Sequence, residues 1–141
     1  AVINTRETDY ALRIVRALDP VNTMATQQIC ENEQIPLKFA YKIISKLDKA
    51  DWIEVHRGAN GGCRLKVDLD TKTVLDLMTA MGRKPLISPC LAEDYECEWK
   101  IEHKCTCTVN EEFARLQQGL EHSMQEYTIR QILDQAESAQ L

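Results

Sequence analysis

The sequence predicts a mainly α-helical fold with one small β-hairpin and a long helix towards its C-terminal end. Three observations predict it. Apolar residues recur at helical spacing in four segments before residue 83 and in a long segment after residue 107. Between residues 52 and 67, two short alternating runs flank a glycine-rich turn. Four cysteines, Cys90, Cys97, Cys105 and Cys107, fall within eighteen residues of a segment with little periodicity.

The composition indicates one domain with its own core, since the chain has 141 residues and 44% of them are hydrophobic. No apolar run approaches the roughly 20 residues of a membrane span, and residues 1–10 are too polar for a secretory signal peptide. We therefore expect a cytoplasmic protein without a membrane partner. Such a protein uses its cysteines for metal or redox chemistry rather than for structural disulfides.

The first two helices are predicted at residues 5–18 and 26–32, and the third has Pro36 in its first turn and runs to about residue 50. Asn4 and Glu7 have the spacing of a capping box at the start of the first helix. Asp19-Pro20 ends that helix, since proline disfavours helical backbone in the residue before it. Pro36 fits the first turn of the third helix, where its missing N–H would have no partner in any case.

The third helix has two distinct faces. Its apolar residues predict a core face made of Phe39, Ala40, Ile43, Ile44 and Leu47. Four lysines alternate with them and form a lysine ridge: Lys38, Lys42, Lys46 and Lys49. Residues 34–66 carry seven Lys and Arg against three acids, a net charge of +4, while the rest of the chain carries −9. A basic patch on an acidic protein indicates an anionic partner, although charges at helical spacing also occur on simply solvated faces.

Two strands are predicted at residues 52–56 and 63–67, joined by the sequence RGANGG at residues 57–62. Three helices followed by a basic hairpin form a winged helix-turn-helix, in which the third helix enters the major groove of DNA. The hairpin is the wing, where arginine suits the backbone or the minor groove. We therefore expect double-stranded operator DNA as the partner. The predicted DNA contacts are Lys38, Tyr41, Lys42, Arg57, Gly58, Asn60 and Gly61.

A fourth helix is predicted at residues 71–81, followed by a long irregular segment that holds the four late cysteines. A loop of this length in a compact domain is usually functional or disordered. Thr108 and Glu111 then form a capping box for a long helix that ends near Ile132-Leu133. Its narrow apolar seam suits pairing with a second copy, although packing on its own domain is the alternative. The predicted dimerisation residues are Phe113, Leu116, Leu120, Met124 and Tyr127.

These elements divide the chain into four parts: a DNA-binding domain at residues 1–82, a cysteine-rich cofactor-binding loop at 83–107, a dimerisation helix at 108–134 and a tail at 135–141. No enzyme is expected, because no phosphate-binding loop, paired-carboxylate site or nucleophile–histidine arrangement can be placed. An adaptor that has lost DNA binding is favoured only by the net charge of −5. The lysine ridge and Arg57 speak against it.

The late cysteines predict a metal or redox site. Thiolates are soft ligands that select zinc, copper(I) or iron–sulfur clusters, and four of them can close a tetrahedral zinc site. A reversible disulfide is the third interpretation, which requires exposed thiols of low pKa. The other two cysteines, Cys30 and Cys63, are expected in the core, since cysteine is among the most often buried residues.

Several segments resemble the Rrf2 family of dimeric winged-helix transcription regulators. The sequence TDYALR at residues 8–13 resembles the opening motif of the family, residues 35–50 its recognition helix and RGANGG its wing. The cysteine loop before a long helix resembles that of its cluster-binding members. The resemblance covers nearly the whole chain. It implies a homodimeric repressor that binds a roughly palindromic operator and senses iron, redox state or nitric oxide through a 2Fe–2S or 4Fe–4S cluster.

The resemblance also implies a ligand set, which consists of Cys90, Cys97, Cys105 and Asp9. The aspartate matches a first-helix carboxylate that ligates the cluster of the partner subunit in some members. This chain departs from the family in its spacing, with six residues between Cys90 and Cys97 and seven between Cys97 and Cys105. Cys107 is therefore a candidate to replace Cys105 or to complete a four-cysteine set, and His103 is a further candidate. A structural zinc or a thiol switch in the same loop is the alternative.

Overall fold

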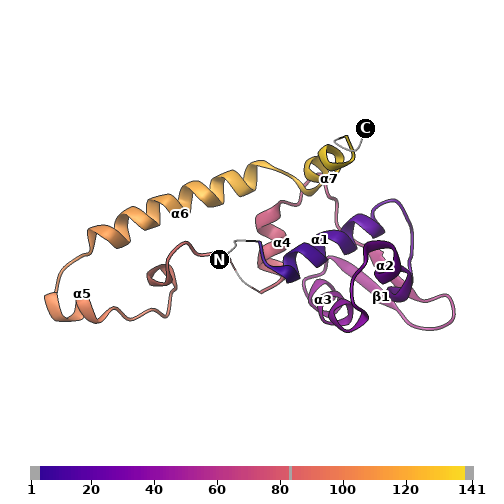
Figure 1. Ribbon diagram of the computed structural model, residues 1–141, viewed down its shortest axis with the longest axis horizontal. Helices are drawn as coiled ribbons and strands as arrows, with labels where there is room; N and C mark the ends of the chain where they lie inside the picture. The colour runs from indigo at the N-terminus through magenta and orange to yellow at the C-terminus, as the bar shows by residue number, and fades with distance from the viewer. Residues whose placement is uncertain (1–3, 83, 139–141) are drawn as a thin grey trace.

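The computed structural model describes residues 4–82 and 84–138, which form a head and a long arm (Figure 1). The head contains α1 (Arg6–Leu18), α2 (Thr26–Glu33), α3 (Leu37–Lys49), β1 (Ile53–His56), β2 (Gly62–Leu65) and α4 (Val74–Ala80). The arm contains the 3-10 turn η1 (Pro89–Leu91), α5 (Glu98–His103) and α6 (Thr108–Glu126), and α7 (Ile129–Ser138) lies back against the head. The predicted mainly helical fold with one small hairpin is confirmed. None of the described helices is long and apolar enough to cross a membrane.

The N-terminal cap of α1 differs from the predicted one. Thr5 is the N-cap, and its hydroxyl oxygen accepts a hydrogen bond from the Thr8 N–H at 3.3 Å. The predicted box of Asn4 with Glu7 is therefore wrong by one residue, and the carboxylate of Glu7 is free for contacts with other helices. A reciprocal capping box does occur at α4, between Thr73 and Asp76.

The turn between α2 and α3 brings α3 onto the core. Gln34 ends α2 in the left-handed conformation with φ of 56°, and the next residue, Ile35, is buried. Pro36 is the N-cap of α3 rather than a residue of its first turn. The predicted core face is buried except for Phe39, which is 39% exposed because it lies at the edge facing α1. There its ring centroid is 6.2 Å from that of Tyr10.

The hairpin pairs β1 with β2 in antiparallel register, with Ile53 opposite Leu65 and His56 opposite Gly62. Met24 adds a further pairing that the sequence did not predict. Its N–H and carbonyl exchange hydrogen bonds with Cys63 at 3.0 and 2.8 Å. The wing is therefore tied to the segment before α2 as well as to α3.

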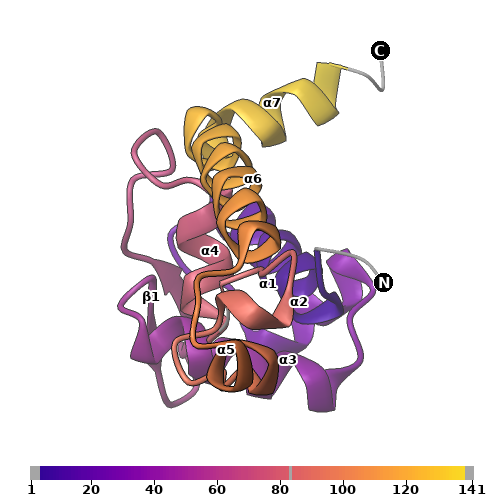
Figure 2. The ribbon, with the colours of Figure 1, turned by 90° about the vertical axis from the view of Figure 1, so that its left-hand side faces the viewer.

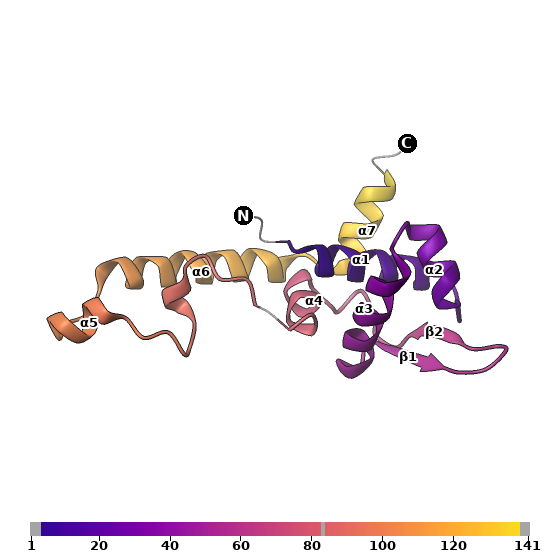
Figure 3. The ribbon, with the colours of Figure 1, turned by 60° about the horizontal axis from the view of Figure 1, so that its bottom comes forward.

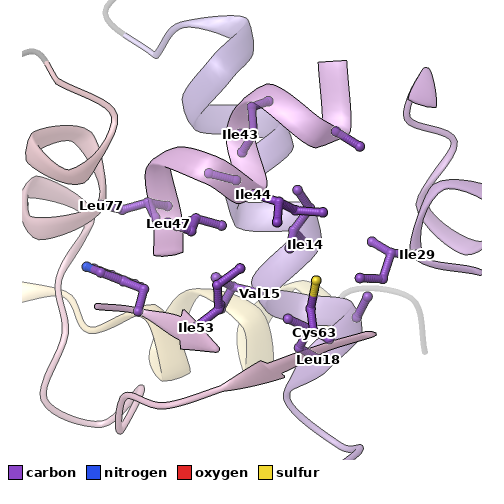
Figure 4. Packing of buried hydrophobic residues seen from close by; sticks show 14 of the residues in the cluster. Ile14, Val15, Leu18, Ile29, Ile43, Ile44, Leu47, Ile53, Cys63 and Leu77 are labelled. Carbon is purple, nitrogen blue, oxygen red and sulfur yellow. The ribbon is translucent and has the colours of Figure 1, made fainter. Parts of the chain in front are cut away.

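The core of the head is a single cluster of apolar side chains, part of which is drawn in Figure 4. It joins α1, α2, α3, the hairpin, α4 and α7. Cys30 and Cys63 are both buried, as predicted, and burial raises the pKa of each thiol. A buried neutral thiol of this kind behaves as a small hydrophobic residue.

The long C-terminal helix is interrupted, so the prediction of one helix to Ile132-Leu133 is wrong. Tyr127 is extended and ends α6, and Thr128 starts α7 through a second capping box with Gln131. Figure 2, which looks along α6, shows α7 leaving in another direction. Ile129 of α7 is completely buried in the head core. The first four residues of the predicted tail belong to α7, and residues 139–141 lie outside the described chain.

Two other predictions about the arm need correction. The segment before α6 is not irregular throughout, because it contains η1 and α5. The predicted capping box of Thr108 with Glu111 is wrong, since Cys107 is the N-cap of α6 and makes no side-chain capping bond.

Candidate nucleic-acid interface and cysteine loop

The exposed face of α3 carries the residues predicted to contact DNA. Lys38 is exposed, and its Nζ lies 5.2 Å from the centroid of the Phe39 ring. Tyr41 is 58% exposed on the next turn. No carboxylate partner is found for Lys38 or Lys49 among the described residues. These two ammonium groups are free to meet phosphate oxygens.

The other two lysines of the ridge are held by one carboxylate. Glu7 Oε1 lies 2.7 Å from Lys42 Nζ, and Glu7 Oε2 lies 2.6 Å from Lys46 Nζ. Hydrogen bonds from Lys42 and then from Lys46 lower the pKa of Glu7. Lys46 also donates to the carbonyl oxygen of Met81 at 3.2 Å. The lysine ridge is thus less positive than the sequence suggests.

The β1–β2 hairpin extends beyond the helices of the head (Figure 3). Arg57 directly follows β1 and is exposed. Its guanidinium has no carboxylate partner within residues 4–82 and 84–138. Gly58, Asn60 and Gly61 form the turn, in which the Gly61 N–H donates to the Gly58 carbonyl at 2.9 Å. A Cβ on Gly61 would lie 2.3 Å from the carbonyl oxygen of His56. Glycine at this position is therefore required to close the turn, whatever contact it makes with DNA.

The late cysteines are spread along the arm. Cys90 lies in η1, Cys97 is the N-cap of α5, Cys107 is the N-cap of α6, and Cys105 lies exposed between these helices. All are free thiols. No three His, Cys, Asp or Glu side chains in the described part of the chain come together as a group that could hold a metal ion. The donor types fit a cluster or zinc, but one chain in this conformation does not gather them.

Cys90 has the most structured surroundings of the four. Ser88 Oγ lies 3.2 Å from its sulfur, and Asn110 Nδ2 donates to the same sulfur at 3.3 Å. Asn110 also donates to the Cys90 carbonyl and accepts from Lys100 Nζ at 3.3 Å. These contacts, with that of Ser88 first and that of Asn110 second, lower the pKa of Cys90. Neither Ser88 nor Asn110 was predicted, and no sequence pattern marked them.

The other candidate ligands lie apart from one another. Asp9 is on α1 and pairs with Arg13 at 3.1 Å. His103 ends α5, where its ring stacks on Trp99 with centroids 4.3 Å apart and its Nδ1 lies 2.8 Å from the Trp99 carbonyl oxygen. Figure 1 shows α5 at the end of the arm remote from α1. Within one chain, Asp9 therefore does not reach Cys97 or Cys105.

Helix α6 buries a polar side chain and leaves apolar ones outside. Gln117 is 6% exposed, and its amide bonds the backbone of the cysteine loop at Pro85 and Ile87. It is the only buried side chain of this 19-residue helix. Of the predicted seam, Leu116 is 60% exposed and Tyr127 is also exposed. The rest of the seam is half-buried, namely Phe113, Leu120 and Met124.

A family model named Rrf2, described as an iron-dependent transcriptional regulator, matches residues 4–135. No curated protein matches the chain. Among solved structures it is similar to CymR (YrzC), the global cysteine regulator of B. subtilis, with a TM-score of 0.69 and 18% identity over 95% of this chain and 98% of that one. It is also similar to T. potens IscR, with a TM-score of 0.67 and 18% identity over 97% and 90%. A third similar structure is the oxidized form of Staphylococcus aureus CymR. Its TM-score is 0.64 and its sequence identity 15%, over 94% of this chain and 96% of that one. These structures support the winged-helix fold.

Proposed function

This chain belongs to the Rrf2 family of transcriptional regulators, and we propose that it is a dimeric DNA-binding regulator whose cysteine loop senses iron, redox state or nitric oxide through an iron–sulfur cluster. The DNA-binding part rests on two exposed cations, Lys38 on α3 and Arg57 on the wing, for which the described residues offer no carboxylate partner. In a winged helix these two elements face the major groove and the adjacent backbone or minor groove. The proposed contacts are Lys38, Tyr41, Lys42, Arg57, Gly58, Asn60 and Gly61.

The test of DNA binding is Arg57→Ala against a duplex from the region upstream of the protein's own gene. We expect the affinity to fall by about 1–3 kcal/mol if Arg57 makes a specific contact. Arg115→Ala is the matched control, because Arg115 is an exposed arginine of α6 that pairs with Glu112. Equal affinities of the two variants at physiological salt would contradict the assignment of the wing.

The dimer is proposed from the exposed apolar residues of α6. A helix of about five turns with no buried apolar side chain contributes little to its own fold, and apolar stripes of this kind are usually covered by a partner. We propose pairing with α6 of a second copy through Phe113, Leu116, Leu120, Met124 and Tyr127. Leu116→Glu should then shift the protein towards the monomer in sedimentation, whereas Gln118→Glu, on the opposite face, should not. A dimer that survives Leu116→Glu unchanged would place the interface elsewhere.

The cluster is proposed at Cys90, Cys97 and Cys105, with the partner subunit's Asp9 as the fourth ligand. α6 is about 28 Å long at 1.5 Å per residue, so antiparallel pairing of two such helices would carry the loop of one chain towards α1 of the other. Cys107 and His103 remain the competing ligands. When bound, the cluster supplies a centre that reacts with oxidants or nitric oxide, and the chain's own thiolates hold it on the arm.

Anaerobic purification with iron, sulfide and zinc analysis tests the cofactor. We expect a coloured protein that contains iron and sulfide, and we expect Cys97→Ser to lose both. Cys30→Ala is the control, because Cys30 is buried in the head. A colourless protein with one zinc per chain, even after anaerobic reconstitution with iron and sulfide, would refute the cluster and favour the zinc site.

A thiol switch in the same loop is the second candidate function. It is favoured by the contacts of Ser88 and Asn110 with the sulfur of Cys90, which stabilise its thiolate. If the metal-free protein loses operator affinity on mild oxidation and regains it with a thiol reductant, the switch operates without a cluster. No change on oxidation would exclude it.

A further inference from the structure

The first turn of α1 contacts the exposed side of the recognition helix through Glu7. This single carboxylate pairs with two of the four ridge lysines, Lys42 at 2.7 Å and Lys46 at 2.6 Å. The lysine side chains come from successive turns of α3, so the two oxygens of Glu7 each hold one ammonium group. The residue is two-thirds buried, and neither lysine has another carboxylate partner in the described chain.

Both lysines lie where DNA phosphates could otherwise attract them. Lys42 is 59% exposed, and it lies on the face of α3 opposite the buried residues. Lys46 is one turn further along, and its hydrogen bond to the Met81 carbonyl holds it near α4. Lys38 and Lys49, by contrast, have no carboxylate nearby among the described residues. Within the lysine ridge, Lys42 and Lys46 are therefore paired with Glu7, whereas Lys38 and Lys49 are not.

We infer that Glu7 is a specificity-determining residue, which competes with DNA phosphates for Lys42 and Lys46 and so lowers the affinity of the regulator for non-specific DNA. This inference rests on the proposed DNA-binding function. Non-specific affinity comes almost entirely from the number of phosphates that Lys and Arg neutralise. Withholding two lysines of the recognition helix therefore weakens every non-specific complex.

The operator complex gains less from the release of these two lysines by Glu7, although Lys42 is itself among the proposed contacts. Base contacts select the operator sequence and so hold the protein in one position on it. A lysine released from Glu7 therefore strengthens this complex only if a phosphate lies within its reach in that position. On non-specific DNA the protein can adopt whichever position brings the most cations to phosphates. Removing the charge of Glu7 should therefore favour non-specific DNA more than the operator.

The test is Glu7→Gln, which removes the charge and keeps the shape of the side chain. Binding to a non-specific duplex is measured by fluorescence anisotropy over a series of salt concentrations, beside binding to the operator. We expect several-fold tighter non-specific binding and a salt dependence, d log K/d log salt, that is steeper by about one to two units, since each new phosphate contact adds about 0.9. The ratio of operator to non-specific affinity should fall.

Glu112→Gln is the matched control, because Glu112 is an exposed acid of α6 whose loss changes the net charge equally. The double variant Glu7→Gln/Lys42→Gln should recover about half of the added slope, which a merely structural effect of Glu7 would not do. Two results would overturn the inference and leave the proposed DNA-binding function intact. One is an equal salt dependence of non-specific binding for Glu7→Gln and Glu112→Gln, and the other is no decrease of the added salt dependence in the double variant. A wild-type protein that binds neither duplex would refute the proposed function together with the inference.

Discussion

Gln117 is the residue through which α6 holds the start of the cysteine loop, and its removal gives the sharpest test of the arm. The Gln117 Nε2 donates to the Pro85 carbonyl at 2.7 Å, and the Ile87 N–H donates to Gln117 Oε1 at 3.0 Å. The N–H and the carbonyl oxygen of the buried Gln117 amide therefore both bond to the backbone segment that leads to Cys90. Gln117→Ala removes both bonds at once.

The magnitude follows from these two bonds. Each contributes about 0.5–1.5 kcal/mol net, so the segment around Ile87 should lose roughly 1–3 kcal/mol of local stability. Opening of this segment should therefore become about 5- to 150-fold more frequent. Global stability should change less, because residues 84–88 contribute no side chain to the head core.

Amide hydrogen exchange of the reduced, metal-free protein measures this opening directly. We expect exchange at Ile87 to accelerate in Gln117→Ala by the factor above and to stay unchanged in Gln118→Ala. Gln118 is the adjacent glutamine, but it is exposed, so its truncation leaves the loop bonds intact. If exchange at Ile87 is the same in both variants, Gln117 does not hold the loop and the account of the arm is incorrect.

Three further predictions concern the head. Ile129→Ala should cost about 2–4 kcal/mol in urea unfolding, because Ile129 is fully buried and truncation leaves a cavity; a cost under about 0.5 kcal/mol, typical of a surface site, would show that α7 does not complete the core. Gly62→Ala should destabilise the wing, because the new Cβ would lie 2.5 Å from the Met24 carbonyl oxygen and break the pairing of Met24 with Cys63. Amide hydrogen exchange of the Cys63 N–H should then become faster, and unchanged exchange would count against this pairing. Burial raises the pKa of Cys30 and Cys63, so their thiols stay neutral to a higher pH than exposed thiols do. In the native, reduced, metal-free protein, mass spectrometry should therefore find both unalkylated until the chain is unfolded, whereas rapid alkylation of either would contradict the packing.

The head was largely predictable because its helices and strands are short, periodic and separated by strong breakers. Asp19-Pro20, Ile35-Pro36 and the RGANGG turn each end an element close to where the structure ends it. Besides the helix caps at Asn4 and Pro36, Phe39 was an exception. Its position fits the helical period of the core face, but periodicity cannot show that Tyr10 would offer it a half-exposed site at the edge of α1.

The arm was less predictable for two physical reasons. The break at Thr128 lies in a stretch where apolar residues continue at helical spacing, and only the T-x-x-Q capping pattern with Gln131 signals it. The buried role of Gln117 depends on backbone groups 30 and 32 residues earlier in the chain, at Ile87 and Pro85. Such long-range polar contacts leave no local pattern in a single sequence.

In the candidate site, too, features that depend on residue identity were predictable, whereas long-range contacts were not. The sequence could predict candidate types of ligand and the exposed cations, because these predictions depend on residue identity. It could not identify Glu7 as the partner of Lys42 and Lys46, which lie 35 and 39 residues away in the chain. The same holds for Cys90, whose contacts with Asn110 join residues that are 20 apart.

The position of Glu7 also bears on how a signal could pass from the cysteine loop to DNA. In one chain α5 lies at the end of the arm, far from α3 in the head (Figure 1). The first turns of α1, however, carry both Asp9, the proposed ligand from the partner subunit's side, and Glu7, which holds two lysines of α3. A cluster that binds Asp9 would therefore act on the same helical turn that sets how many recognition-helix cations are free. In the proposed dimer, the shortest physical connection between the cysteine loop and DNA would then run through α1, and the long arm would bring the loop of one subunit to the head of the other.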